Sequence, residues 1–216
     1  MNALLELSRP APRPAFAPAA PGSWSQEPAA LQEACRTLSP RYSEAWSETQ
    51  RVGLLTRDCL DRGRNGGGRA VPRVALPPPA AAAFDSMSRA LEGGRWDAAR
   101  RLVVVSPERP SDVLCALWLA CRSGLFRPGS RTADSAGKSS RLGIVPLFAS
   151  EASLAAAPAT MAALYGNGAF KLHLAARGNR QHVVVGLREA CVEQRLTRQA
   201  HAWGVCLRLS SAAGVA

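Results

Sequence analysis

From residue 101 onward, short apolar runs of strand length alternate with longer stretches of helical periodicity. The runs that predict strands lie at 102–105, 142–148, 182–185 and 205–209. The helical patterns between them cover 113–122, 152–165 and 189–201. This alternation is typical of parallel β/α units, because two parallel strands need a long connection, which is usually a helix. The predicted fold class is therefore α/β: either a partial (β/α) barrel of about four parallel strands with flanking helices, or a small open sheet.

The region before residue 101 predicts helices instead of strands. Apolar residues recur at helical spacing from 31 to 60, and Pro40 divides this stretch into two helices. A loop rich in Gly and Pro is expected at 61–80, followed by a helix at 81–92 with Phe84, Met87 and Leu91 on one face. We therefore expect a helical segment at 31–100 and the partial barrel at 101–216.

Residues 1–30 predict a disordered arm. Prolines at 10, 12, 14, 18 and 21 remove backbone donors and oppose a helix. The arm is rich in Ala and Pro, with Arg9, Arg13 and few acids, a composition that also fits an organellar transit peptide. A solvated N-terminus without targeting function is the simpler interpretation, and we expect a cytoplasmic protein.

The charge balance raises the question of an anionic partner. The formal net charge is +11, carried almost entirely by Arg, since Lys138 and Lys171 are the only lysines. The arginines are scattered, however, and do not interleave with aromatic residues as in a platform for single-stranded nucleic acid. Nucleic-acid binding is therefore not favoured.

The six cysteines do not predict a metal or redox motif. None forms a pair at two-residue spacing, and Cys115 and Cys121 flank an apolar run that favours buried, reduced thiols. That run, Val113 to Cys121, is also the longest apolar one and is too short to cross a bilayer, so no membrane partner is expected.

Six short strings in the chain resemble, in order, segments of the phosphoenolpyruvate carboxylase family. They are Tyr42 to Leu60, Ser111-Asp112-Val113-Leu114, Arg122-Ser123-Gly124-Leu125, Val145-Pro146-Leu147-Phe148 with Leu154 to Pro158, Gln181 to Gly186, and Gly204 to Leu209. Each string alone is a weak signal, whereas six in one order are a strong one. The resemblance covers about residues 40–216, and it implies the central part of a barrel enzyme.

The resemblance implies a reaction and a set of site residues. The family converts phosphoenolpyruvate and bicarbonate to oxaloacetate and phosphate with Mg or Mn, at the carboxyl ends of barrel strands. Two carboxylates hold the metal, an Arg within Gly-Arg-Gly-Gly neutralises the substrate's charge, and a His handles the proton and carboxyl-transfer steps. The strings found here include no counterpart of that His.

The chain departs from this pattern at the positions that carry the chemistry. Ala149 stands where the family has its first metal-ligating Glu, and nearby Glu151, expected in a loop, is a weak substitute. Gly186 is followed by Leu187-Arg188-Glu189 in place of Tyr-Ser-Asp, so Glu189 is the one candidate metal ligand, and a weak one. The Arg of Gly-Arg-Gly-Gly falls on Ala213. No catalytic residue is therefore assigned, and we expect this chain alone to bind neither metal nor substrate productively.

Three functional hypotheses follow from these observations. The first is a carboxylase-like protein that is inactive alone. The second is a non-catalytic fragment or pseudoenzyme that binds a full-length homologue or a second copy of itself. The third is a basic protein that binds anions or nucleic acid.

Other residues that could carry chemistry have simpler interpretations. Gly137-Lys138-Ser139 resembles the end of a phosphate-binding loop, but it precedes a predicted strand instead of opening a helix. His173, His182 and His201 lack a nucleophile or carboxylate at a catalytic spacing, and Trp118 and Trp203 are expected to pack in the core.

Overall fold

A computed structural model describes part of the chain. The described residues are 24–39, 41–43, 45–64, 84, 87, 89, 101–128 and 139–186. Within them the elements follow one another in a fixed order. They are β1 (Trp24–Gln26), α1 (Pro28–Leu38), α2 (Glu48–Arg64), β2 (Arg101–Val105), α4 (Pro110–Arg122), β3 (Phe126–Arg127), β4 (Ser139–Ser140), β5 (Gly143–Phe148), α5 (Glu151–Gly166), α6 (Gly168–Ala175) and β6 (Val184–Val185).

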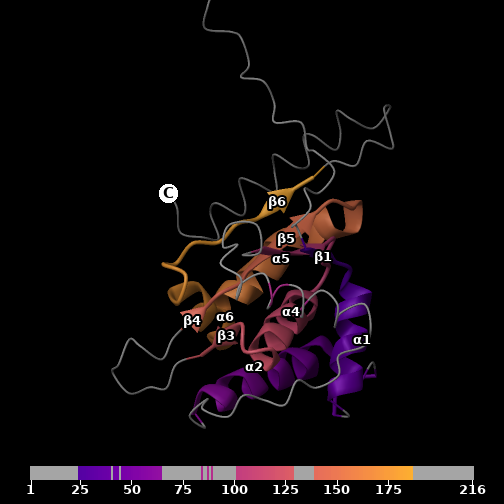
Figure 1. Cartoon of the computed structure of the whole chain (residues 1–216). Coiled ribbons are helices and arrows are strands. Elements are labelled where there is room, and N and C mark those ends of the chain that lie inside the picture. Colours follow the sequence, from indigo (N-terminus) through magenta and orange to yellow (C-terminus); the bar gives the residue numbers. More distant parts are fainter. Residues whose placement is uncertain are drawn as a thin grey trace, which may run out of the picture.

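The predicted α/β class is confirmed by a parallel sheet of four strands in the order β1-β2-β5-β6. The register pairs Val105 with Leu147 and Leu147 with Val184, so these three side chains share one face of the sheet. Leu102 and Val104 of β2 point to the other face and are fully buried. The helices α1, α2 and α4 lie together beside the sheet (Figure 1).

The helix α4 is the centre of the structure. Every residue from Ser111 to Cys121 is buried, which is the pattern of a helix covered on all sides. α4 contacts β2 and β5 on one side and α1 and α2 on the other. Trp118, at 1% exposure, fills part of this contact, as expected for a packing residue.

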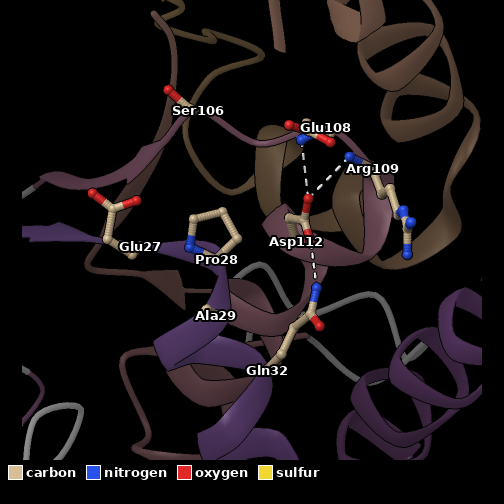
Figure 2. A pocket seen from close by; sticks show the side chains of 8 residues that line it. All are labelled: Glu27, Pro28, Ala29, Gln32, Ser106, Glu108, Arg109 and Asp112. Carbon is tan, nitrogen blue, oxygen red and sulfur yellow. Dashed lines mark hydrogen bonds between the residues drawn. The ribbon is translucent and has the colours of Figure 1, made fainter. Parts of the chain in front are cut away.

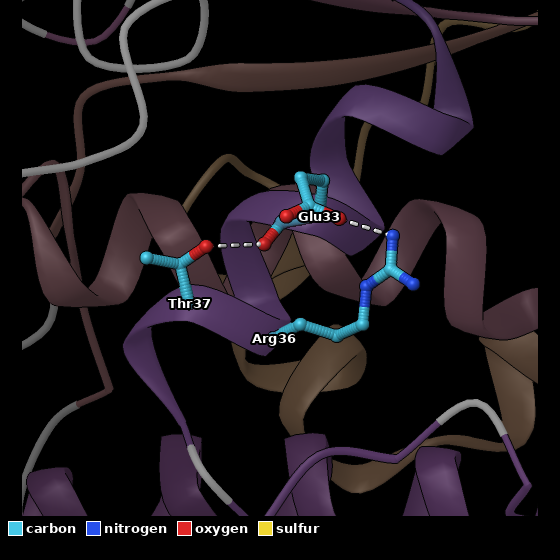
Figure 3. A network of polar contacts seen from close by, with 3 residues as sticks. All are labelled: Glu33, Arg36 and Thr37. Atoms are coloured by element: carbon cyan, nitrogen blue, oxygen red, sulfur yellow. Dashed lines mark hydrogen bonds and ion pairs between the residues drawn. The ribbon is translucent and has the colours of Figure 1, made fainter.

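Local capping explains where the other helices begin. Pro28 occupies the first turn of α1, where a missing N–H is tolerated. The Oγ of Ser150 accepts the N–H of Ser153, and the Oγ of Ser153 accepts the N–H of Ser150, which fixes the start of α5. α5 continues through Pro158 to its end. The outer side of α1 carries the Arg36–Glu33 ion pair and the Thr37 hydroxyl on the Glu33 carbonyl (Figure 3).

The last residues of the predicted arm belong to the fold, contrary to expectation. Trp24–Gln26 forms β1, parallel to β2, and α1 begins at Pro28. A three-residue strand is too short for an alternating pattern, so its pairing with β2, far along the chain, is what defines it. The remainder of the arm lies outside the described residues.

Three further segments differ from the prediction. α2 extends to Arg64, four residues into the expected loop. The expected loop at 127–141 contains a short antiparallel pair, in which Phe126 faces Ser140. α6 was not predicted at all, and Asn167 caps it by accepting the N–H groups of Ala169 and Phe170.

Some predictions can be checked only in part. Phe84 and Met87, from the predicted helix at 81–92, are helical and buried as expected. The helix at 189–201, the strand at 205–209, His201 and Trp203 lie outside the described residues. Among those described, no helix combines the length and apolar character that a membrane crossing requires.

Candidate functional site at the carboxyl ends of the strands

The four parallel strands end at one edge of the sheet, here called the carboxyl edge. The residue that follows each strand marks it: Glu27 after β1, Ser106 after β2, Ala149 after β5 and Gly186 after β6. Parallel α/β sheets place their ligand sites at this edge, because the loops that follow the strands converge there. The carboxyl edge is therefore where chemistry is expected.

A hollow of about 320 Å³ opens at the β1–β2 part of the carboxyl edge. Its walls come from the first turn of α1 and from the turn between β2 and α4 (Figure 2). The residues that line it are Glu27, Pro28, Ala29, Gln32, Ser106, Glu108, Arg109 and Asp112. The lining is strongly polar, with three carboxylates and one guanidinium.

Asp112 organises the turn beside this hollow. Its side chain is 4% exposed, and its Oδ2 accepts the backbone N–H groups of Glu108 and Arg109, each at 3.0 Å. Its Oδ1 accepts the Gln32 side-chain amide at 2.5 Å, which ties α1 to the start of α4 (Figure 2). All of these bonds are internal, so the carboxylate holds the turn together and is not directed at a ligand.

The N-terminus of α4 is also occupied by protein groups. Glu48, the first residue of α2, accepts the backbone N–H and the hydroxyl of Ser111, both at 2.8 Å. Pro110 has no N–H to offer, and the N–H of Asp112 reaches the Arg109 carbonyl. A helix N-terminus with free amides can bind phosphate, but here the first-turn amides already have partners.

Ser106 has the backbone geometry that is unusual for its residue type. Its φ is +49°, in the left-handed region that side chains other than glycine rarely adopt. Its N–H reaches the Leu147 carbonyl at 2.7 Å, so the end of β5 holds the turn in this conformation. Strain of this kind concentrates at turns that a fold must shape closely.

The ends of β5 and β6 lie side by side. The Gly186 N–H donates to the Phe148 carbonyl at 3.0 Å. A Cβ built on Gly186 would lie 3.7 Å from the Cβ of Ala149 and 3.3 Å from Leu147, so these two loops begin in contact. Side chains from the two loops could therefore meet at one point of the carboxyl edge.

Comparison with known proteins decides which family this architecture represents. The model of the family described as phosphoenolpyruvate carboxylase matches residues 25–193, which is more than half of the chain. The chain belongs to the phosphoenolpyruvate carboxylase family. A phosphoenolpyruvate carboxylase of Roseiflexus castenholzii (strain DSM 13941 / HLO8) is 30% identical over 151 residues, which is 66% of this chain and 14% of that relative. The chain thus spans a small part of the length of a curated phosphoenolpyruvate carboxylase.

The matched range refines the resemblance seen in the sequence. It begins at residue 25 and so includes part of β1 and all of α1, before the predicted start near residue 40. It ends at residue 193, so the string from Gly204 to Leu209 and the position of Ala213 lie beyond it. The Ser111-Asp112 string lies within the match, and in this structure both side chains are used for internal hydrogen bonds.

The described residues do not fit the two-carboxylate metal site expected of a phosphoenolpyruvate carboxylase. Ala149 ends in a methyl group beside Gly186, and neither provides a side-chain oxygen. Glu151 is the first residue of α5, not part of a loop as expected, and it is exposed. Where the structure describes the chain, no three His, Cys, Asp or Glu side chains gather to hold a metal. The predicted candidate Glu189, with Leu187 and Arg188, lies outside the described residues.

Two groups of residues were not anticipated from the sequence. Glu27, Ser106, Glu108 and Arg109 line the hollow. The Glu-Pro and Ser-Pro pairs that end β1 and β2 are ordinary turn signals, so they did not distinguish these positions.

The second group surrounds His173 on α6. This ring is 1% exposed and packs edge-on against Phe126, with ring centroids 5.4 Å apart. Burial, followed by the nearby charge of Arg177, lowers the pKa of His173 to about 3. His182 is exposed.

Proposed function

We propose that this chain carries the barrel framework of a phosphoenolpyruvate carboxylase without the metal-dependent chemistry, and that alone it does not form oxaloacetate. The observation that carries the proposal is the methyl group of Ala149 at the junction of β5 and β6, where the resemblance implies a metal-ligating Glu. A carboxylate is the ligand type that Mg²⁺ and Mn²⁺ prefer, and a methyl group cannot replace it.

The order of the strands supports a barrel segment over an open doubly wound sheet. In a barrel, neighbouring strands follow the order of the chain, whereas a doubly wound sheet reverses its order at a switch point. The order β1-β2-β5-β6 contains no reversal. The four strands are therefore proposed to be consecutive staves of a (β/α) barrel.

An assay for oxaloacetate tests the catalytic part of the proposal. The purified chain is incubated with phosphoenolpyruvate, bicarbonate and either Mg²⁺ or Mn²⁺, and oxaloacetate is reduced to malate by an added dehydrogenase while NADH absorbance is followed. The expected rate equals that without protein. A rate that scales with the amount of chain and depends on bicarbonate overturns the proposal.

The variant Ala149→Glu tests whether position 149 limits metal binding. A carboxylate at the β5–β6 junction is expected to raise the affinity for Mn²⁺ by roughly tenfold or more, which corresponds to about 1.4 kcal/mol. Ala149→Gln is the matched control, since it adds the same bulk without charge and is expected to leave Mn²⁺ binding unchanged. Binding is measured by the loss of the free Mn²⁺ resonance signal. Equal affinities for the two variants contradict the assignment.

A second candidate function, association with a full-length homologue, is favoured by the face of the sheet opposite α4. Val103, Val105, Leu147 and Val184 share this face and are only partly buried. In a closed barrel this face is packed interior. Among the described residues, β1 and β6 also have a strand neighbour on one side only. Co-expression with a tagged full-length carboxylase, followed by gel filtration, is expected to give a complex, and separate elution contradicts this function.

A further inference from the structure

Four buried cysteines lie in the layer formed by α1, α2 and α4. Cys35 is on α1, Cys59 on α2, and Cys115 and Cys121 on α4, with exposures of 1%, 1%, 0% and 6%. Hydrogen bonds between thiols group them into two pairs, Cys35 with Cys115 and Cys59 with Cys121. Each pair joins α4 to a different helix.

The contact around the Cys59–Cys121 pair is fixed by neighbouring side chains. The Trp118 indole Nε1–H donates to the Asp58 carboxylate at 3.3 Å, and Asp58 immediately precedes Cys59. The Arg122 guanidinium lies over the Trp118 ring, 4.5 Å from its centroid, and immediately follows Cys121. The two sulfur atoms are therefore held against each other by contacts between α2 and α4.

The two thiols of this pair differ in their chemistry. The hydrogen bond from Cys59 lowers the pKa of Cys121, and the positive charges of Arg62 and Arg122 act in the same direction. The same hydrogen bond, followed by burial, raises the pKa of Cys59. The thiolate is the reactive form of cysteine, so Cys121, which is also the more exposed of the two, is the nucleophile.

We propose that Cys121 and Cys59 are a peroxide-sensitive thiol pair whose oxidation links α2 covalently to α4. The Cys121 thiolate attacks one oxygen of hydrogen peroxide, the O–O bond breaks, and the departing hydroxide takes up the Cys121 proton, which leaves a sulfenic acid. The Cys59 sulfur then attacks the sulfenic sulfur, the S–O bond breaks, and the hydroxyl leaves as water with the Cys59 proton. Two thiols thus lose two electrons and form one disulfide, while one peroxide is reduced to two waters.

The Cys35–Cys115 pair provides an internal comparison. Burial, followed by its hydrogen bond with Cys115, raises the pKa of Cys35. The Cys115 thiol donates to the Tyr42 hydroxyl at 3.6 Å, and both sulfur atoms are more deeply buried than that of Cys121. This pair is expected to stay reduced at peroxide doses that oxidise the first.

Peptide mapping of the full chain tests the proposal. Cys191 and Cys206, which lie outside the described residues, are replaced by Ser so that they cannot exchange with the pair. The folded protein is treated with increasing hydrogen peroxide, free thiols are blocked with an alkylating agent, and the chain is digested without reductant. Chymotrypsin is used because cleavage after Trp118 separates Cys115 from Cys121.

The expected product is a Cys59–Cys121 linked peptide that lacks the mass of two hydrogen atoms and separates on reduction. In the Cys59→Ser variant, the sulfenic acid on Cys121 is expected to persist and to react with dimedone. In the Cys121→Ser variant, Cys59 is expected to remain fully alkylated. The proposal is overturned if Cys59 and Cys121 are both alkylated in the treated parent protein, or if the Cys35–Cys115 link forms at lower peroxide. The parent protein alone decides between these outcomes, so a variant that does not fold leaves the test intact.

Discussion

Acid is expected to destabilise this chain through His173, whose environment favours a neutral ring. The Ser140 hydroxyl donates its single hydrogen to the Leu142 carbonyl at 3.0 Å, and its Oγ lies 2.9 Å from the His173 Nδ1. The Oγ must therefore accept, so Nδ1 carries the ring hydrogen. This leaves Nε2 as a buried acceptor that has no hydrogen-bond partner among the described residues. A proton on Nε2 would place a charge in the core without a partner for it.

The magnitude follows from the two pKa values of the ring. In the unfolded chain the pKa of a histidine is near 6.5, whereas in the folded chain that of His173 is about 3. Below pH 6.5 the unfolded chain binds a proton that the folded chain does not. The stability contribution is therefore complete above pH 6.5 and is lost as the pH falls from there toward 3. Linkage gives about 1.4 kcal/mol per pH unit in this window, or about 2 kcal/mol between pH 7.5 and 5.0.

Urea unfolding followed by circular dichroism at several pH values measures this loss. The control is His173→Asn, because an Asn amide can still donate toward Ser140 but does not ionise in this range. The variant is expected to be less stable at every pH, and the loss of its unfolding free energy on acidification should be about 2 kcal/mol smaller than that of the parent. Carboxylates and the other histidines are common to both proteins, so the difference isolates His173. Parallel pH profiles for the two proteins refute the reasoning.

Two further predictions concern the carboxyl edge. Asp112→Ala is expected to lower the unfolding free energy by about 2–4 kcal/mol, because it leaves the Gln32 amide and two turn N–H groups without their acceptor; a loss under 1 kcal/mol in urea unfolding contradicts the role assigned to this carboxylate. Ser106→Gly is expected to stabilise the chain by up to about 1 kcal/mol by relieving the positive φ, whereas Ser106→Ala retains the strain. Thermal melting of both Ser106 variants checks this, and equal melting temperatures contradict it.

The larger elements of this fold could be predicted because their patterns are local. The β-branched run at 102–105 and the apolar run ending at Phe148 became the two paired strands β2 and β5. Trp24–Gln26 and Val184–Val185 are too short to show a period, and their strand character depends on partners distant in the chain. β1 was therefore missed, whereas β6 was predicted because it lies within a run of three valines.

The site could be predicted only where a residue's identity decides the outcome. Ala149 has no oxygen in any conformation, so its effect on metal binding can be inferred from the sequence. The role of Asp112 required the structure, because Gln32 is 80 residues away along the chain. The contact of Glu48 with Ser111 likewise spans 63 residues. Long-range polar contacts of this kind have no local signature.

The two halves of the carboxyl edge use their polar groups differently, and this separates stability from chemistry. In the β1–β2 half, Glu48 and Asp112 are taken up by the turn and by the start of α4, so changing them is expected to unfold the chain before it alters ligand binding. In the β5–β6 half, Ala149 makes no polar side-chain contact, and none of the hydrogen bonds that stabilise the first half depends on it. A carboxylate introduced at position 149 therefore leaves the Asp112 network intact. Metal affinity can thus be altered at one end of the edge without weakening the fold at the other.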